Sequence, residues 1–323
     1  MDKFEDVVLT TRIRFARNIK GKKFTNNMSS HEKEDLLLQI KDKLKNDYNV
    51  LRLSDIDDVT KKSLVETHTI SKELINENDS AIIHDEKNSI VIMINEEDHF
   101  RIQAFANGFD TEETYRNIKE ADKIISSNIE YAINKDYGYI TACPTCIGTG
   151  MRVSVMLHLP SLEKIHALDR VFSNISNLGI AIRGMYGENS NSECAIYQIS
   201  NQKTIGMTEE EIIKKVNEVT SYLVKQERKA REMLETRIEV KDDILRSYGI
   251  LKYAELVSKK EAMRLLSNIY LGINMKYIND IKLYNIKELM EEVGINTLRK
   301  KLKDNFSREE ENIKRAEYIK SKI

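Results

Sequence analysis

The sequence has few cysteines, no surplus of either charge and no long apolar run. Its three cysteines, Cys143, Cys146 and Cys194, are too few for the disulfide framework of a small secreted protein. Lys and Arg number 51 against 52 Asp and Glu, so bulk attraction to nucleic acid or to a membrane has no basis. No window approaches 18 apolar residues, and the N-terminal segment lacks an apolar stretch of signal-peptide length. We therefore expect a cytoplasmic protein that binds neither nucleic acid nor membrane.

Proline and glycine are scarce and unevenly placed. Both prolines, Pro144 and Pro160, and seven of the twelve glycines fall between residues 138 and 206. Because these residues form turns, their concentration indicates loops shaped around a ligand.

Apolar residues on either side of that region recur at helical or strand spacing. The helical patterns cover 31–47, 111–134 and 161–178, and short β-branched runs cover 80–84, 89–95, 181–186 and 194–199. Strands that adjoin in pairs, with helices between the pairs, favour an α+β fold. Continuous helical periodicity without proline follows from residue 207. We predict one domain over residues 1–232 and an all-helical domain over residues 233–323.

The usual glycine-rich phosphate loops are absent from the sequence. There is no GxxxxGK[ST] segment, GxGxxG is broken by Val153 at its sixth position, and protein-kinase strings are missing. A nucleotide site would therefore be built from side chains. Arginine suits this role because its planar fork donates parallel hydrogen bonds to phosphate oxygens. On an extended chain Arg12 and Arg14 point to one face, although scattered arginines are also common as solvated surface residues.

Cys143-Pro-Thr-Cys146 leaves three interpretations open. A redox pair would need a lowered thiol pKa and a neighbouring βαβ unit. A zinc site would need four ligands, and only Cys194 and scattered histidines remain. Two small buried thiols in a tight turn are the third interpretation.

The residues that follow Cys146 favour another interpretation of this segment. CPTCIGTGMR, residues 143–152, resembles the CP[ST]NxGTGxR signature of the ATP:guanido phosphotransferases, the phosphagen kinase family. TRIRFARN, NEEDHFR and RGMYGE resemble three further motifs of that family, in the family's order, within residues 7–206. The bacterial protein arginine kinase branch is the most similar. The resemblance implies a phosphagen-kinase-type catalytic domain, with an antiparallel sheet flanked by helices, followed by a helical domain for dimerisation and substrate recognition.

The resemblance also implies roles for particular residues. Glu97 and Glu188 would hold the acceptor guanidinium, with Glu188 as the base and Cys143 beside it. Magnesium would be held by the nucleotide phosphates and not by a protein metal site. The ATP-binding residues implied by the resemblance are Thr10, Thr11, Arg12, Ile13, Arg14, His68, Arg101, Arg152, Val153, Ser154, Val155, Met156, Arg183, Gly184, Met185, Tyr186, Gly187 and Glu188.

Two positions depart from the family pattern. Cys146 stands where the family usually has Asn, and the branch's RDxxRA motif reads ENIKRA here, so that only Arg315 and Ala316 remain of a regulatory phosphoarginine site. The loss of the leading arginine puts that site in doubt.

The function implied is transfer of the ATP γ-phosphate to arginine residues in proteins, which marks them for regulated proteolysis or modulates stress-response regulators. The resemblance implies a homodimer, a zinc-binding activator and a Clp-type protease as partners. Only nine residues precede Thr10, so we expect an open acceptor side that admits a polypeptide. The alternatives are a kinase for free arginine and a catalytically weak adaptor that binds phosphoarginine or ATP.

Overall fold

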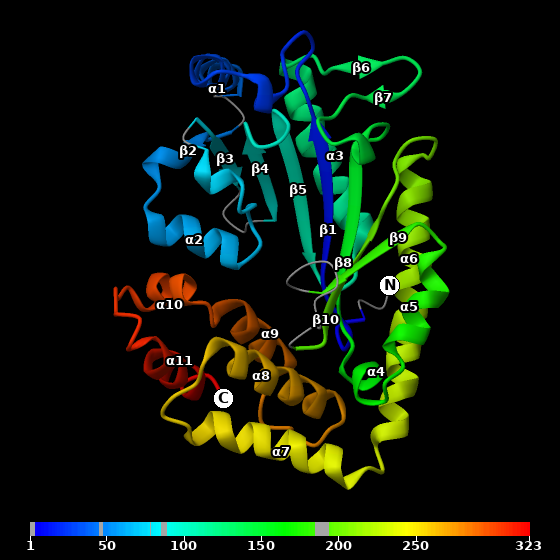
Figure 1. Ribbon diagram of the computed structural model, residues 1–323, viewed down its shortest axis with the longest axis vertical. Coiled ribbons are helices and arrows are strands. Elements are labelled where there is room, and N and C mark those ends of the chain that lie inside the picture. The colour runs from blue at the N-terminus through cyan, green and yellow to red at the C-terminus, as the bar shows by residue number, and fades with distance from the viewer. Residues whose placement is uncertain (1–3, 45–47, 78, 85–88, 185–193) are drawn as a thin grey trace.

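The computed structural model describes residues 4–44, 48–77, 79–84, 89–184 and 194–323. In these ranges eight strands form one antiparallel sheet in the order β2-β3-β4-β5-β1-β8-β10-β9, and two short strands form a hairpin (Figure 1). The strands of the sheet are β1 (Val8–Arg17), β2 (Leu51–Arg52), β3 (Ala81–His84), β4 (Ile90–Ile94), β5 (Phe100–Asn107), β8 (Met151–His158), β9 (Ile180–Gly184) and β10 (Ile196–Asn201). The hairpin consists of β6 (Ile133–Asn134) and β7 (Gly138–Tyr139).

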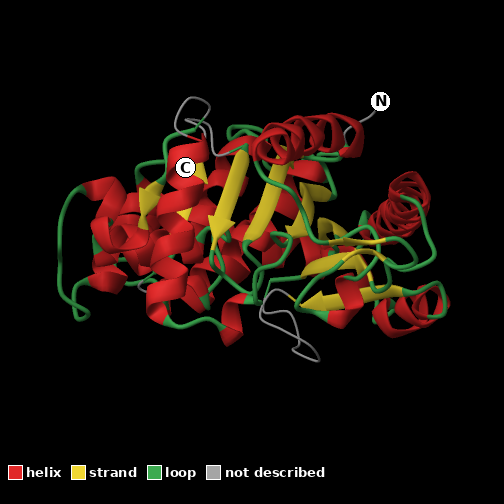
Figure 2. Ribbon diagram, turned by 90° about the horizontal axis from the view of Figure 1, so that it is seen from above, coloured by secondary structure: helices red, strands yellow, loops and turns green. Residues whose placement is uncertain are grey.

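Helices make up the C-terminal third of the chain. The view from above shows helices around the strands (Figure 2). The first group is α1 (Ser30–Leu44), α2 (Asp58–Glu66), α3 (Thr111–Asn128), α4 (Pro160–Lys164), α5 (Leu168–Ser176) and α6 (Glu209–Leu234). The C-terminal group is α7 (Ile238–Tyr253), α8 (Lys259–Asn274), α9 (Leu283–Glu292), α10 (Ile295–Leu302) and α11 (Glu311–Lys320). Among the described helices, none combines the length and the apolar character needed to cross a bilayer. The predicted α+β class is confirmed.

The central strand β1 explains why the two faces of the sheet differ. Successive side chains of a strand point to opposite faces, and in β1 Thr11, Ile13 and Phe15 are buried whereas Arg12 and Arg14 are partly exposed. The buried face packs against α3 and α6 and holds the main hydrophobic cluster. The opposite face carries the arginines and is therefore the face on which the site forms.

The predicted helix over 111–134 is shorter than the sequence pattern suggested. It begins at the predicted residue, because Asp110 accepts a hydrogen bond from the Glu113 amide at 3.0 Å. It ends at Asn128 because the chain beyond pairs with the residues that follow β1, where the Ala132 amide donates to the Asn18 carbonyl at 2.7 Å.

The predicted helix over 161–178 is two helices, α4 and α5. His166 separates them with a φ of 55°, a left-handed conformation that no α-helix continues through. The first turn of α4 is held by Glu227 of α6, whose carboxylate accepts hydrogen bonds from the amides of Ser161 and Leu162 at 2.8 and 2.9 Å.

The C-terminal helices α7 to α11 form a second hydrophobic cluster, which lies below the sheet in Figure 1. Leu9 and Ile196 of the sheet region belong to this cluster, and the Nε2 atom of His158 lies 2.7 Å from Ser267 Oγ of α8. The predicted division after residue 232 falls in the last turn of α6. We therefore keep that boundary as a proposal.

Candidate active site

Strand register brings the predicted arginines onto one face of the sheet. Arg12 and Arg14 are two residues apart on β1, and Arg152 of β8 lies directly opposite Arg14. Arg101 of β5 lies opposite Ala16, which shares the face of Arg12 and Arg14. These residues come from three adjacent strands, so only the long-range pairing places them together.

The fifth predicted arginine lies further along the same face. Arg183 of β9 is opposite Gln198 of β10, and Gln198 Oε1 accepts a hydrogen bond from Arg12 Nη2 at 3.1 Å. We call the surface formed by these five side chains the arginine face. Its members are Arg12, Arg14, Arg101, Arg152 and Arg183.

The charge distribution on the arginine face favours an anion. Burial, together with the charges of Arg101 and Arg152, lowers the pKa of Arg12 to about 10. Burial and the charges of the same neighbours and of Arg12 lower the pKa of Arg14 well below its ordinary value. Both shifts show that the guanidinium groups lie close together with too little negative charge among them. Phosphate oxygens would supply that charge and match the forked donors.

Glu96 fixes one of these arginines and was missed by the sequence prediction. Its buried carboxylate accepts a hydrogen bond from Arg101 Nη1 at 2.5 Å through one oxygen. The other oxygen accepts a hydrogen bond from the Glu97 amide at 2.8 Å. Glu96 therefore links the orientation of Arg101 to the position of Glu97. The signal was present, since the two acids are adjacent in NEEDHFR, but only one was assigned a role.

Glu97 lies in the loop between β4 and β5, within the field of the arginines. Partial burial and the negative charges of Asp98 and Glu96 raise the pKa of its carboxylate, while Arg101 and Arg152 oppose the shift. Its side chain is exposed and is therefore accessible to an acceptor. The structure thus places Glu97 near the arginine face, and its role in holding the acceptor guanidinium stays a prediction.

Asp98 ties the Glu97 loop to the loop that carries Cys143. Its carboxylate oxygen Oδ1 accepts hydrogen bonds from Asn18 Nδ2 at 2.5 Å and from the Ala142 amide at 2.7 Å. Asn18 in turn accepts a hydrogen bond from the His99 amide at 3.0 Å. The asparagine of TRIRFARN and the Asp-His of NEEDHFR therefore position these loops.

The two cysteines of CPTC are free thiols in a short 3-10 turn. Cys143 Sγ lies 3.1 Å from Thr145 Oγ1, and the Thr141 hydroxyl donates to the Cys143 carbonyl at 2.7 Å. Burial raises the pKa of the Cys146 thiol, although Arg152 and Arg14 oppose this. Cys146 therefore lies against the arginine face at the position where the family has Asn.

Arg17, the third arginine of TRIRFARN, has a structural role on the opposite face. It is fully buried, pairs with Asp122 at 3.1 Å and donates to the carbonyls of Ala16 and Thr149. A Cβ atom at Gly150 would lie 2.6 Å from Arg17 Nη1. The second glycine of the GTG segment is therefore needed for this close approach and not for holding a phosphate.

His68 belongs to a cavity at the other end of the arginine face. The cavity measures about 90 Å³, and its sheet side is lined by Thr10, Arg12, His68, Ser154, Met156 and Gln198. Burial and the nearby charge of Arg12 lower the pKa of His68 to about 4. Its imidazole is therefore neutral at ordinary pH. The structure places His68 beside Arg12, and its role in binding ATP stays a prediction.

Four of the predicted ATP residues turn their side chains away from this face. Thr11, Ile13, Val153 and Val155 are buried on the side of α3 and α6, and the Thr11 hydroxyl is bound to the Gly108 carbonyl at 2.7 Å. These positions form the strands, and their side chains do not reach a nucleotide. Gly184 ends β9, whereas Met185, Tyr186, Gly187 and Glu188 lie outside the described residues.

The remnant of the phosphoarginine motif lies in the core of the C-terminal helices. Arg315 is fully buried and donates to the carbonyls of Val293 and Val257 at 2.8 and 2.9 Å. Its guanidinium also pairs with Glu311, the acid that replaces the leading arginine of the motif, and with Asn312. Ala316 is buried beside it. A role of Arg315 and Ala316 in binding phosphoarginine remains a prediction.

The comparisons with known proteins agree with this geometry. The profile of the ATP:guanido phosphotransferase C-terminal catalytic domain matches residues 31–230, and the profile of the protein-arginine kinase McsB C-terminal domain matches residues 237–323. The protein-arginine kinase of Clostridium acetobutylicum is 41% identical over 330 residues, covering 99% of this chain and 97% of its own. That of Bacillus subtilis is 36% identical over 294 residues, covering 88% and 81%.

A solved structure gives the same fold. The duplicated taurocyamine kinase from Schistosoma mansoni superposes with a TM-score of 0.61 at 27% identity, over 69% of this chain and 33% of that one. The large antiparallel sheet with flanking helices is therefore a fold that this chain shares with guanidino kinases. The chain belongs to the ATP:guanido phosphotransferase family and, within it, to the protein-arginine kinases.

Proposed function

We propose that this enzyme transfers the γ-phosphate of ATP to the guanidinium of arginine residues in proteins. The observation that supports this most strongly is the convergence of Arg12, Arg14, Arg101 and Arg152 on one face, next to the accessible carboxylate of Glu97. Phosphoryl transfer requires mainly an in-line arrangement and positive charge around the transferred group. The arginine face supplies the positive charge.

The acceptor must be made nucleophilic. A guanidinium has a pKa above about 12, so it is cationic and its nitrogens are poor nucleophiles. Glu97 on one side would offset this charge and orient one nitrogen, and Glu188 would accept the proton that this nitrogen loses. The bond between the γ-phosphorus and the bridging oxygen breaks, a phosphorus–nitrogen bond forms, and ADP leaves. Cys143 would lie beside the guanidinium and help to position it.

Magnesium would accompany the nucleotide. In the described part of the chain, no three His, Cys, Asp or Glu side chains gather as a metal-binding group. As the family resemblance implies, the ion would be held through the phosphates, where it would neutralise charge that the arginines leave uncompensated.

The cellular setting follows from the family alone and is part of the proposal. Phosphoarginine would mark cytoplasmic proteins for a Clp-type protease or modulate stress-response regulators, a zinc-binding protein would activate the enzyme, and the chain would act as a homodimer. Its relatives are named for their action on protein arginine.

The test compares two acceptors. The purified chain, with ATP and magnesium, is incubated either with a denatured arginine-containing protein or with free arginine, and acid-labile phosphate is measured on each. Phosphate on the protein, at a rate well above that on free arginine, supports the proposal. Transfer to free arginine alone would assign the chain to small-molecule kinases. ATP binding without transfer to either acceptor, also when the zinc-binding activator is added, would favour an adaptor.

A further inference from the structure

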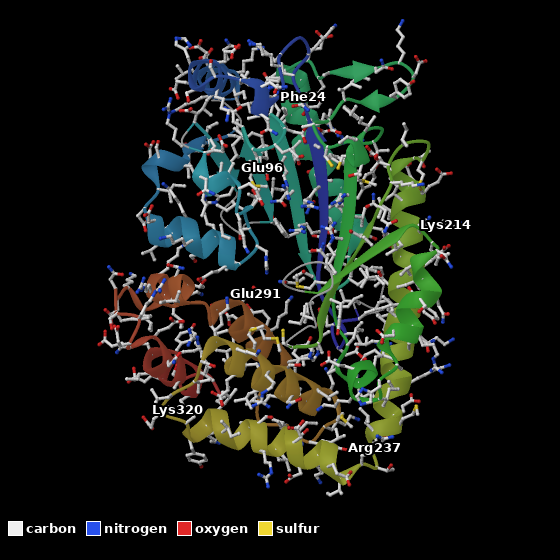
Figure 3. All side chains as sticks on the ribbon, in the orientation of Figure 1. Phe24, Glu96, Lys214, Arg237, Glu291 and Lys320 are labelled. Carbon is white, nitrogen blue, oxygen red and sulfur yellow. The ribbon has the colours of Figure 1, made fainter. Side chains whose placement is uncertain are left out.

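The cavity beside His68 is not made by the sheet alone. Its opposite wall comes from α8 and α9 of the C-terminal helices. The residues lining that wall are Met263, Lys287, Met290 and Glu291. Figure 3 shows Glu291 on α9, facing the lower end of the sheet, far from Glu96 at the upper part. The cavity therefore lies between the two parts of the chain.

The direction of the phosphates places the nucleoside in this cavity. Arg14, Arg101 and Arg152 lie toward the Glu97 end of the face, whereas Thr10 and Arg12 come earlier on β1. A triphosphate whose γ-phosphate points at Glu97 therefore leaves its nucleoside near Thr10. The cavity there is lined by apolar side chains together with polar and charged groups that a ligand could contact.

Two polar side chains of the cavity form no hydrogen bond with the residues that the structure describes. Ser154 is 2% exposed and lines the cavity, and within the described ranges its hydroxyl has no hydrogen-bond partner. Glu291 also lines the cavity; the charge of Lys287 acts on its carboxylate, but no described residue forms a hydrogen bond or a close ion pair with it. A buried hydroxyl without a partner costs free energy, so a ligand that bonds to it would relieve that cost.

We propose that α8 and α9 complete the nucleoside pocket, with Glu291 accepting a hydrogen bond from the nucleoside of ATP. A carboxylate pairs only with donors, and at this end ATP offers the ribose hydroxyls and the 6-amino group of adenine. Met263 and Met290 supply an apolar surface for the base. The inference rests on the proposed function for the orientation of the nucleotide, and it assigns part of the ATP site to the C-terminal helices.

This wall is held firmly against the sheet. Lys287, one turn before Glu291, donates to Asn107 Oδ1 of β5 at 2.8 Å. Glu66, two residues before His68, accepts hydrogen bonds from the amide and hydroxyl of Thr297 at the start of α10, both at 2.9 Å. The two walls of the cavity are therefore tied together, with both the His68 loop and α9 held in place.

The experiment measures nucleotide binding without any acceptor. ATP is titrated calorimetrically into the wild type, Glu291→Ala, Glu291→Gln and a control, Glu288→Gln. Glu288 lies one turn earlier on α9. It lines a neighbouring cleft bordered by α9 and α10 but not the cavity beside His68. We expect Glu291→Ala to weaken ATP binding about tenfold, about 1.4 kcal/mol. Glu288→Gln should bind as the wild type does. Thermal unfolding without nucleotide identifies any variant that fails to fold. If Glu291→Ala does not fold, Glu291→Gln takes its place in the test, because glutamine keeps the volume of the side chain and removes the charge.

Two nucleotide analogues identify the donor. If Glu291 binds the ribose 2′-hydroxyl, 2′-deoxy-ATP lacks the donor and should bind with the same affinity to the wild type and to Glu291→Ala. If Glu291 binds the 6-amino group of adenine, inosine triphosphate lacks that donor, and Glu291→Ala should not weaken its binding. Either result supports the proposal. Unchanged ATP affinity in folded Glu291→Ala and Glu291→Gln overturns it, as does an equal loss in Glu288→Gln. The titration contains no acceptor, so it measures ATP binding alone. A failure of phosphoryl transfer in the separate acceptor test would refute the proposed function without changing the outcome of this titration.

Discussion

Arg14 and Arg152 lie directly opposite each other on β1 and β8, at the centre of the sheet. Like charges opposite each other on neighbouring strands destabilise a sheet, by up to about 1 kcal/mol. Burial lowers the pKa of Arg14, and the charges of Arg12, Arg101 and Arg152 lower it further, which agrees with repulsion between these side chains. Such a pair suits an anion-binding site, because both guanidinium groups are attracted to an anion bound between them.

Replacing Arg152 should therefore separate stability from binding. Arg152→Ala should leave the thermal stability of the nucleotide-free protein unchanged or slightly higher, because a repulsive neighbour of Arg14 is removed. It should weaken ATP binding by about 2–3 kcal/mol, the value of a charge-assisted hydrogen bond. Thermal unfolding with and without ATP measures both effects. Arg246→Ala, on the exposed surface of α7, is the control. An unchanged ATP titration for Arg152→Ala would refute its place in the phosphate site.

Glu97 should act on transfer and not on nucleotide binding. Glu97→Gln removes the charge that offsets the acceptor guanidinium, so kcat should fall by about 10²–10⁴, while ATP affinity changes by less than about tenfold, roughly 1.4 kcal/mol. Single-turnover transfer and an ATP titration measure the two quantities. Glu130→Gln, on an exposed surface ion pair, is the matched control. A loss of ATP binding without loss of transfer at saturation would contradict this role.

The acid limb of the pH profile should come from Glu97. Burial and neighbouring acids raise its pKa above the ordinary value of a glutamate, and the ionised form is the one that offsets the guanidinium. The rate should therefore fall as the pH decreases through this raised pKa and level off above it. Initial ADP release, followed from neutral pH downward, measures the profile. The Glu97→Gln variant should lose this limb; an identical limb in that variant would assign the titration to another group.

Glu188 is predicted as the base from the sequence, and it lies outside the described residues. Glu188→Ala should abolish arginine phosphorylation, because the acceptor nitrogen cannot lose its proton, while ATP affinity stays within about tenfold, roughly 1.4 kcal/mol. Neutral-pH mass spectrometry of the acceptor and an ATP titration are the measurements. An undiminished rate would refute the assignment.

Some residues of the candidate site could be predicted from the sequence pattern, and others could not. Arg12 and Arg14 were predictable as a pair, because the period of an extended strand is two. Arg101 and Arg152 were assigned by resemblance only, since their meeting depends on register between strands far apart in the chain. The break at His166 was not predictable from periodicity, because the apolar spacing continues through it.

The wall that α8 and α9 contribute to the proposed nucleoside pocket could not be predicted from the sequence, for a related reason. Glu291 and Met263 follow an ordinary helical pattern, and nothing local shows that α8 and α9 face the arginine-bearing sheet. Only tertiary packing brings them there. Glu96 is the opposite case, because it was visible in NEEDHFR and its pairing with Arg101 could have been considered.

The most direct test of the account follows the γ-phosphorus itself. Phosphorus NMR at neutral pH, with the protein, ATP, magnesium and an arginine-rich polypeptide, should show the γ-phosphate signal replaced by a phosphorus–nitrogen signal that disappears in acid. With Arg152→Ala, at ATP concentrations that do not saturate this variant, the signal should grow more slowly. A γ-phosphate that appears only as inorganic phosphate, or as an acid-stable ester on hydroxyl groups, would contradict the account.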